Sequence, residues 1–336
     1  MPGITDVRGI LVGHAQDDSA LTGCTAVLAM GGAVAGVDVR GSAPGTRETD
    51  LMRPCNLVER IHAVMLAGGS AFGLDAACGA MQFLEERAVG FDTGYGVVPI
   101  VGAAVIFDLD IGDPKVRPDK RMGYAACAAA SAGPPAEGNS GAGLGATVGK
   151  TRGARCSMKG GTGTWSVRLP RPGGALEPVV VGAIVVVNAL GDVVDPDSAR
   201  VIAGAYDRDT RRFLQPDISS AAAGAVADVF PSGNTTLAVV ATDARLDKEG
   251  ANKLAQMAHD GLARVIRPIH TMYDGDVVFA LSTGDKPLTG DKATDVTVLG
   301  AAAAEVVAVS VLRAVGAATT AAGVPAARDV ASGGRG

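Results

Sequence analysis

The organisation of this chain follows from one stretch, Pro231-Ser232-Gly233-Asn234-Thr235-Thr236-Leu237-Ala238-Val239-Val240-Ala241-Thr242. Its first four residues are turn formers, and they run without a spacer into two threonines and an apolar, β-branched segment. The pattern predicts a buried strand that begins at Thr235. Two adjacent hydroxyl groups are an unusual way to start such a strand.

Thr235 is therefore a candidate nucleophile. A threonine hydroxyl needs a base to take its proton, and the α-amine of the same residue can serve once it is free. Within a continuous chain that nitrogen is an amide, so the Asn234–Thr235 bond has to be cut first. The hydroxyl can make this cut by attacking the preceding carbonyl group in an N-to-O acyl shift, and Gly233 gives the backbone the freedom that such strain requires. Taken alone, the same residues are also typical of a loop that enters a strand.

The composition favours a large core built from small side chains. The chain has 336 residues, of which 47% are hydrophobic but only 4% aromatic, and it contains 47 glycines. Packing of Ala, Val and Leu with closely approaching backbones suits layered sheets and helices. The net charge of -5 and the lack of a basic run with interleaved aromatic residues argue against nucleic-acid binding, so the expected partner is a small molecule.

The sequence also indicates a cellular compartment. Residues Met1 to Asp6 lack the basic and apolar regions of a secretory signal. The five cysteines are odd in number and include no Cys-x-x-Cys pair, which is typical of buried apolar residues in a reducing environment. The cytoplasm is therefore the expected location.

Hydrophobic periodicity predicts strands and helices along the whole chain. The predicted strands lie at residues 9–12, 25–28, 35–39, 63–66, 102–109, 164–169, 179–187, from 235 onward and 277–281, and the predicted helices at 70–87, 118–131 and 247–266. The apolar segment 296–318 is long enough to span a membrane, but Glu305 lies inside it, which favours a buried helix. Residues 192–233 are rich in charged and small residues, which predicts a linker that leads to the proposed cut.

Four further polar residues are candidates for the same site. Lys150 ends a glycine-rich run whose backbone N–H groups suit an oxyanion, although its spacing fits neither a Walker A nor a Rossmann loop. Asn188 ends a strand that is nearly all apolar. Asp274 and Asp276 lie on a turn before another strand, where holding a cation is preferred to binding a metal because no further ligands cluster with them. A solvated lysine, a turn-forming asparagine and a polar turn are the alternative interpretations.

Five motifs together resemble one family, the self-processing amidohydrolases that include DmpA-like D-aminopeptidases, β-peptidyl aminopeptidases and NylC-like nylon-oligomer endo-hydrolases. The motifs are Gly68-Gly69-Ser70-Ala71-Phe72-Gly73-Leu74-Asp75, Gly141-Ala142-Gly143-Leu144-Gly145-Ala146-Thr147-Val148-Gly149-Lys150, Val187-Asn188, Gly233-Asn234-Thr235-Thr236-Leu237 and His270-Thr271-Met272-Tyr273-Asp274-Gly275-Asp276. They keep their order over nearly the whole chain, from about Ile4 to the long C-terminal helix.

The resemblance implies an α/β fold, a four-layer αββα sandwich of the N-terminal-nucleophile type. It implies a single domain, residues 1–336, cut between Asn234 and Thr235 into a 1–234 chain and a 235–336 chain that assemble as a homo-oligomer, a tetramer in the family. No cofactor and no metal are expected.

The resemblance also implies a role for each candidate residue. Thr235 would be the nucleophile, and Lys150 would lower the pKa of its ammonium group so that part of it is neutral near pH 7. Asn188 would donate its amide to the developing oxyanion. Asp274 and Asp276 would orient the charged pair.

The substrate class is the least determined expectation. Two threonines after the cut resemble the nylon-oligomer branch, so hydrolysis of linear 6-aminohexanoate oligoamides is favoured. Aminopeptidase action on short D-, L- or β-peptides is the alternative, and it would need a further carboxylate, for which Asp75, Asp108 and Glu48 are available by type. Phe107 stands where the oligomer branch has a tyrosine, which removes a hydroxyl group. A second alternative is an acyltransferase of the ornithine-acetyltransferase kind, which passes the acyl group to an amine.

Overall fold

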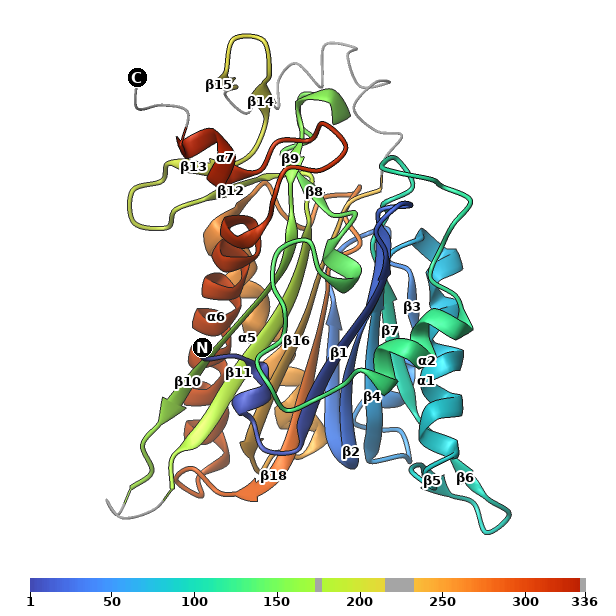
Figure 1. The fold of residues 1–336 in the computed structure, drawn as a ribbon. Helices are drawn as coiled ribbons and strands as arrows, with labels where there is room; N and C mark the ends of the chain where they lie inside the picture. Colours follow the sequence, from blue (N-terminus) through green and yellow to red (C-terminus); the bar gives the residue numbers. More distant parts are fainter. Residues whose placement is uncertain (173–176, 215–232, 333–336) are drawn as a thin grey trace.

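The computed structural model describes residues 1–172, 177–214 and 233–332, and it is organised around a nine-stranded mixed sheet (Figure 1). The strand order is β10-β11-β16-β18-β2-β4-β7-β3, with β1 paired to β2 outside this path. The strands of this sheet are β1 (Ile10–Asp17), β2 (Thr22–Val39), β3 (Thr46–Arg47), β4 (Arg60–Ala67), β7 (Val101–Val105), β10 (Gly161–Leu169), β11 (Val179–Asn188), β16 (Thr235–Ala244) and β18 (Val277–Lys286).

Strand β2 is 18 residues long and joins the two halves of this sheet. One of its edges pairs with β4. Its other edge pairs with β1 through residues 22–29 and with β18 through residues 34–39. The two halves are therefore two packed layers that share one strand.

Strict side-chain alternation places the two sheet layers face to face. In β11, Val180, Ile184 and Val186 point into the core between the sheet layers, whereas the intervening residues from Val179 to Val187 point to the helices α5 (Lys248–Val265) and α6 (Lys292–Ala317). In β4, Val64 and Leu66 point to the same central core. This is the period-two pattern of strands that are buried on both faces.

The helices cover the outer faces of the two sheet layers. Helices α5 and α6 pack on the β10–β11–β16–β18 layer, and α1 (Ala76–Glu85) and α2 (Lys120–Ala128) pack on the β1–β2–β4–β7 layer (Figure 1). Asp119, Asp247 and Asp291 cap the first turns of α2, α5 and α6 by accepting backbone N–H groups. The order helix, sheet, sheet, helix is the predicted αββα sandwich.

Shorter strands and one short α-helix also lie in the described part of the chain. They are β5 (Phe91–Asp92), β6 (Val97–Val98), β8 (Thr147–Val148), β9 (Met158–Lys159), β12 (Asp192–Val194), β13 (Val201–Ala203), β14 (Tyr206–Asp207), β15 (Arg212–Phe213), β17 (Ile266–Arg267) and α7 (Ala327–Ser332). The predicted linker is wrong for residues 192–214, because β12 to β15 pair there. The rest of the predicted linker, residues 215–232, lies outside the described residues and includes Pro231 and Ser232. The described chain resumes at Gly233.

Helix α6 is long and apolar enough to cross a membrane by length and composition, and 61% of its most apolar window is buried. It packs against α5, β10 and β11. The expected buried helix is therefore found at this position.

Candidate active site

Thr235 lies at the first position of β16, as the sequence predicts, and its side chain is only 4% exposed. Strand β16 runs between β11 and β18, and Thr235 stands opposite Asn188 in the register with β11. The site is therefore located at the upper end of the sheets in Figure 1, where β8, β9 and β12 also lie.

The Thr235 hydroxyl group points back to its own preceding peptide. Its Oγ1 atom donates to the carbonyl oxygen of Asn234 at 2.5 Å. Because a C=O bond is about 1.2 Å long, Oγ1 lies at most about 3.7 Å from the carbonyl carbon that an N-to-O shift attacks. The backbone N–H of Gly275 donates to the same carbonyl oxygen at 2.7 Å. An N–H group in this position stabilises negative charge on that oxygen.

Asn234 is held from both sides. Its backbone N–H donates to the carbonyl oxygen of Tyr273 at 3.2 Å, while its carbonyl group accepts from Gly275. Phe107 packs beside the preceding residue, because a Cβ atom added to Gly233 would lie 3.0 Å from the Cβ of Phe107. The bond before Thr235 therefore has a fixed position between the loop before β18 and the segment after β7.

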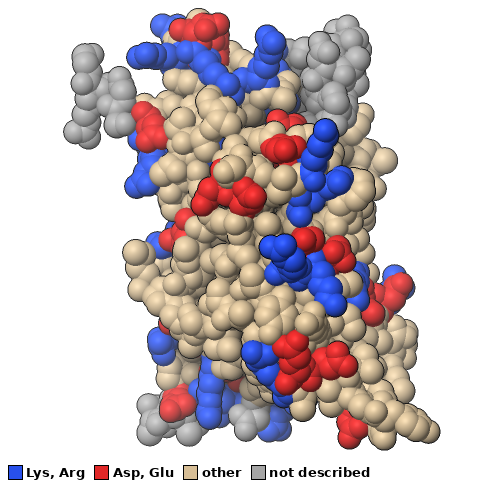
Figure 2. Space-filling model, turned by 45° about the vertical axis from the view of Figure 1, so that its right-hand side comes forward, with Lys and Arg blue, Asp and Glu red and all other residues tan. Residues whose placement is uncertain are grey.

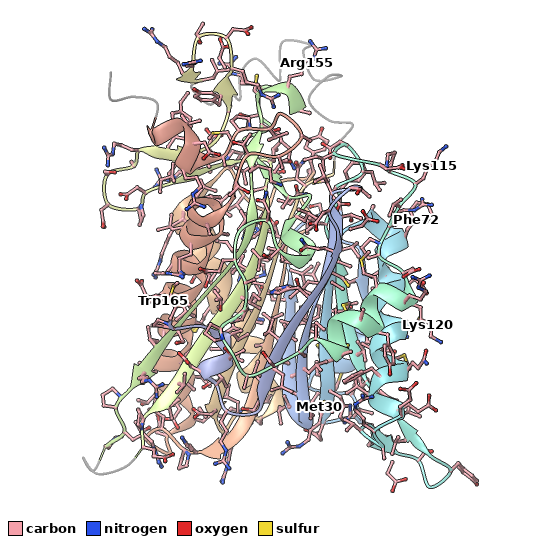
Figure 3. The ribbon with its side chains drawn as sticks, viewed as in Figure 1. Met30, Phe72, Lys115, Lys120, Arg155 and Trp165 are labelled. Carbon is pink, nitrogen blue, oxygen red and sulfur yellow. The ribbon has the colours of Figure 1, made fainter. Side chains whose placement is uncertain are left out.

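Lys150 and Asn188 meet next to Thr235. The Lys150 Nζ atom donates to Asn188 Oδ1 at 2.9 Å, and the backbone N–H of Thr147 donates to the same oxygen at 3.0 Å. The Asn188 Nδ2 atom donates to the Phe107 carbonyl group at 2.9 Å. Both side chains are almost fully buried. Lys115, in the segment before α2, and Lys120, the first residue of α2, lie by contrast on the outer surface (Figure 3).

Asp274 and Asp276 are fully buried in the turn before β18 but contact different groups. Asp276 Oδ1 accepts the backbone N–H of Thr236 at 2.6 Å, and its Oδ2 accepts Nδ1 of His270 at 2.8 Å. Asp274 Oδ2 accepts the backbone N–H and the hydroxyl group of Thr271. Asp276 thus fixes the residue that follows Thr235.

Burial dominates the electrostatics of the site. It lowers the pKa of Lys150 to about 8, while the negative charges of Asp110, Asp274 and Asp108 act in the opposite direction. The lysine therefore stays largely protonated at pH 7. Burial also raises the pKa of Asp274, and the neighbouring Asp276 charge adds to this effect. Among the described residues, Lys150 forms no ion pair with Asp274 or Asp276, so the influence of Asp274 on its pKa acts through space.

Sequence reasoning missed three groups around the site. Gly275 supplies the N–H group at the Asn234 carbonyl, and its position between two candidate carboxylates was the available signal. His270 lies in the motif His270-Thr271-Met272-Tyr273-Asp274-Gly275-Asp276, but only the structure reveals its contact with Asp276. Lys159 is fully buried, and a lysine in a Ser-Met-Lys-Gly-Gly segment carries no sign of burial. Within residues 1–172, 177–214 and 233–332, no three His, Cys, Asp or Glu residues cluster as metal ligands.

The αββα layers define a class, the N-terminal-nucleophile hydrolase fold. A solved structure of this fold, the L-aminopeptidase D-Ala-esterase/amidase of Ochrobactrum anthropi, superposes with a TM-score of 0.70 at 21% identity, covering 94% of this chain and 86% of that chain. Residues 3–328 of this chain match Peptidase family S58, and the chain belongs to that family.

Two relatives in sequence agree with this assignment. An uncharacterized aminopeptidase of Mycobacterium leprae is 44% identical over 97% of this chain and 93% of its own length. A 6-aminohexanoate-oligomer endohydrolase of Paenarthrobacter ureafaciens is 34% identical over 92% of this chain and 84% of its own length. The protein is therefore an enzyme of the hydrolase class, with peptidase or amidohydrolase activity.

Proposed function

We propose that this protein is an amide-bond hydrolase whose nucleophile is Thr235, released as a new chain terminus by self-cleavage. One observation carries the proposal: the Thr235 hydroxyl group lies 2.5 Å from the Asn234 carbonyl oxygen, which also accepts the Gly275 N–H group at 2.7 Å. Attacking group, scissile carbonyl and oxyanion donor are thus already assembled in the continuous chain.

Self-cleavage would proceed in two steps, an N-to-O acyl shift and the hydrolysis of the resulting ester. The Thr235 Oγ1 atom attacks the Asn234 carbonyl carbon and loses its proton, the C–N bond breaks, and that proton passes to the Thr235 nitrogen, which becomes an amine. Water then hydrolyses the resulting ester, which leaves a carboxylate on Asn234 and restores the hydroxyl group. The products are the chains 1–234 and 235–336.

The same residues would then act on substrates. The free amine of Thr235 takes the hydroxyl proton, and the Lys150 charge keeps a useful fraction of that amine neutral. Asn188 has one N–H directed to Phe107, and its second N–H is the proposed oxyanion donor. Asp276 holds the backbone after the nucleophile, and Asp274 contributes negative charge near Lys150.

Denaturing mass spectrometry tests the nucleophile. We expect two fragments from the wild-type chain, the smaller beginning at Thr235, and one uncut, inactive chain from Thr235→Ala. Thr235→Ser, which keeps a hydroxyl group, should still be cut. An uncut wild-type chain that hydrolyses amides would refute the mechanism.

For the substrate, we propose linear oligoamides such as 6-aminohexanoate oligomers. A bound substrate ammonium group would require an available carboxylate near the nucleophile. Asp108 is 3% exposed and already accepts Thr22 Oγ1 and the Gly69 N–H, and Asp75 accepts the Lys120 N–H at the start of α2. An oligoamide needs only an apolar pocket for its methylene groups, each of which contributes about 0.8 kcal/mol of binding free energy when buried. Such a pocket suits this core better than a site for an ammonium group.

Aminopeptidase action is the second candidate, because Asp110 is exposed and its charge reaches Lys150. The decisive assay compares 6-aminohexanoate oligomers, the same oligomers with a blocked amino end, and aminoacyl anilides. Oligoamide hydrolysis predicts that blocking the amine leaves oligomer cleavage intact. Turnover of free-amine substrates only, lost in Asp110→Asn, would instead establish the aminopeptidase. Adding an acceptor amine and analysing the products separates either hydrolase from an acyltransferase.

We further propose a single-domain, cytoplasmic homo-oligomer that acts on small molecules. On the face drawn in Figure 2, basic and acidic side chains are interspersed among large uncharged areas, which supports a small-molecule partner rather than a polyanion. Native mass spectrometry measures the oligomeric state, and a mass of one chain pair would refute the oligomer.

A further inference from the structure

Lys159 is a buried cation that the mechanism above does not use. It lies in β9, its side chain is 0% exposed, and its Nζ atom donates to the carbonyl groups of Leu144 and Ala146, each at 2.7 Å. Among the described residues it forms no ion pair with a carboxylate. Burying an ammonium group without such a partner is costly, so the position calls for a compensating role.

The contacts of Lys159 lead directly to the candidate oxyanion donor. The Ala146 carbonyl group and the Thr147 N–H belong to one peptide unit. Lys159 donates to the oxygen of this unit, and the N–H of the same unit donates to Asn188 Oδ1 at 3.0 Å. Withdrawing electron density at the oxygen strengthens the N–H as a donor, and linked hydrogen bonds polarise one another.

Asn188 Oδ1 therefore receives hydrogen bonds from two sides. Lys150 Nζ donates at 2.9 Å and the polarised Thr147 N–H at 3.0 Å. An amide whose oxygen accepts strong donors has more acidic N–H groups, and its plane is fixed by the same bonds. Both effects improve Asn188 Nδ2 as a donor to an oxyanion.

We propose that Lys159 is a positioning residue that polarises and orients the Asn188 amide through the 146–147 peptide. This inference rests on the proposed function, in which Asn188 stabilises the oxyanion. The alternative is that Lys159 only holds the glycine-rich loop together. The loop role predicts lost stability alone, whereas the relay predicts slower chemistry.

The surroundings of Lys159 bring the pKa of its amine close to neutral pH. Burial lowers its pKa to about 7, and the Lys150 charge acts in the same direction, while Asp108 and Asp110 oppose it. Near neutral pH the amine is therefore partly charged, and its effect on Asn188 depends on that charge.

The chain offers a matched control. Lys248 is also buried, 4% exposed, and its Nζ donates to the carbonyl groups of Leu51, Asn56 and Val58. None of these groups belongs to the candidate site. Lys159→Met and Lys248→Met therefore delete the same charge and the same kind of contact at two places.

The experiment measures kcat and KM of folded, processed protein with whichever probe the wild type turns over, the 6-aminohexanoate trimer or an aminoacyl anilide. We expect Lys159→Met to lower kcat roughly tenfold with little change in KM, and Lys248→Met to keep kcat within about twofold. In an Asn188→Ala background, Lys159→Met should change kcat by less than about twofold, because the donor it acts on is gone. Self-cleavage, in which Gly275 contacts the carbonyl group, should be affected less than turnover.

Two outcomes would overturn the inference: a kcat of Lys159→Met equal to that of Lys248→Met, or a tenfold loss that persists unchanged in the Asn188→Ala background. If Lys159→Met does not fold, Lys159→Gln replaces it, since it keeps amide donors for the carbonyl groups but not the charge, and the same criteria apply. Failure of the proposed function is recognised separately, because Asn188→Ala alone would then turn over at the wild-type rate.

Discussion

Gly275 limits which side chains can lie beside Thr235, the proposed nucleophile. A Cβ atom added there would lie 2.7 Å from Thr235 Oγ1 and 2.7 Å from the Ala43 carbonyl oxygen. Gly275→Ala should therefore displace the hydroxyl group or the Gly275 N–H and slow self-cleavage by about 100-fold or more. Time-resolved denaturing gels measure this rate. Gly316→Ala, where nothing lies within 4 Å, is the control, and equal rates in the two variants would contradict the assigned geometry.

Lys150 provides a second prediction at this scale. Lys150→Met removes the charge that contacts Asn188 while keeping most of the side-chain volume. We expect kcat to fall by about 100-fold or more in protein that is folded and processed. Lys115→Met, at an exposed position, should have the wild-type rate. A nearly normal rate in Lys150→Met would mean that the lysine serves packing only.

The sequence anticipated some residues of the site better than others. Thr235, Asn188 and Lys150 belong to motifs, and the structure brings them together. Lys159 could not be anticipated, because its burial depends on β8 and β9 folding over the sheet ends, and no local pattern distinguishes a buried lysine from an exposed one.

Close backbone contact between β10 and α6 gives a prediction about these elements. A Cβ atom at Gly163 would lie 2.1 Å from the Ser310 carbonyl oxygen and 2.5 Å from the Ala314 nitrogen. Gly163→Ala must push the helix off the sheet and should cost roughly 1–3 kcal/mol of unfolding free energy. Gly31→Ala in β2 meets nothing within 4 Å and is the control. Chemical denaturation compares them, and equal midpoints would contradict the contact.

The sequence predicts the position of a strand where its hydrophobic pattern matches its burial in the fold, as in β11 and β16. The sequence predicts separate strands at 25–28 and 35–39, because glycines punctuate the β-rich runs of this segment. The structure instead continues as the single strand β2, with a register shift between Leu28 and Ala33 that absorbs the glycines. The short strands between 192 and 214 escaped prediction because pairs of two or three residues produce no periodic signal.

On the scale of the whole molecule, the proposed cut divides a sheet that remains paired. Strand β16 of the 235–336 chain pairs with β11 of the 1–234 chain, and β18 pairs with β2. The two fragments should therefore co-elute in native size-exclusion chromatography and separate only in denaturant. Separation without denaturant would mean that the β11–β16 and β2–β18 strand pairs open after the cut.

The buried amine of Lys159 predicts how stability depends on pH. Its pKa is about 7 in the folded protein and near 10.5 ordinarily, so between these values the unfolded chain binds more protons on it. This group therefore adds stability as the pH rises from about 7 to about 10. As the pH rises across this range, the Tm of the wild type should therefore increase relative to the Tm of Lys159→Met. Calorimetry at several pH values measures it, and a constant difference would contradict the assigned burial of the charge.

Strand β2 has a further consequence because it belongs to both sheet layers. Neither layer can lose it without exposing the apolar core that they share, so the two layers are expected to melt as one cooperative unit. Attack by proteases on either layer then depends on opening of both. The proposed self-cleavage would thus leave the molecule resistant to cutting elsewhere, because both fragments stay within one cooperative unit.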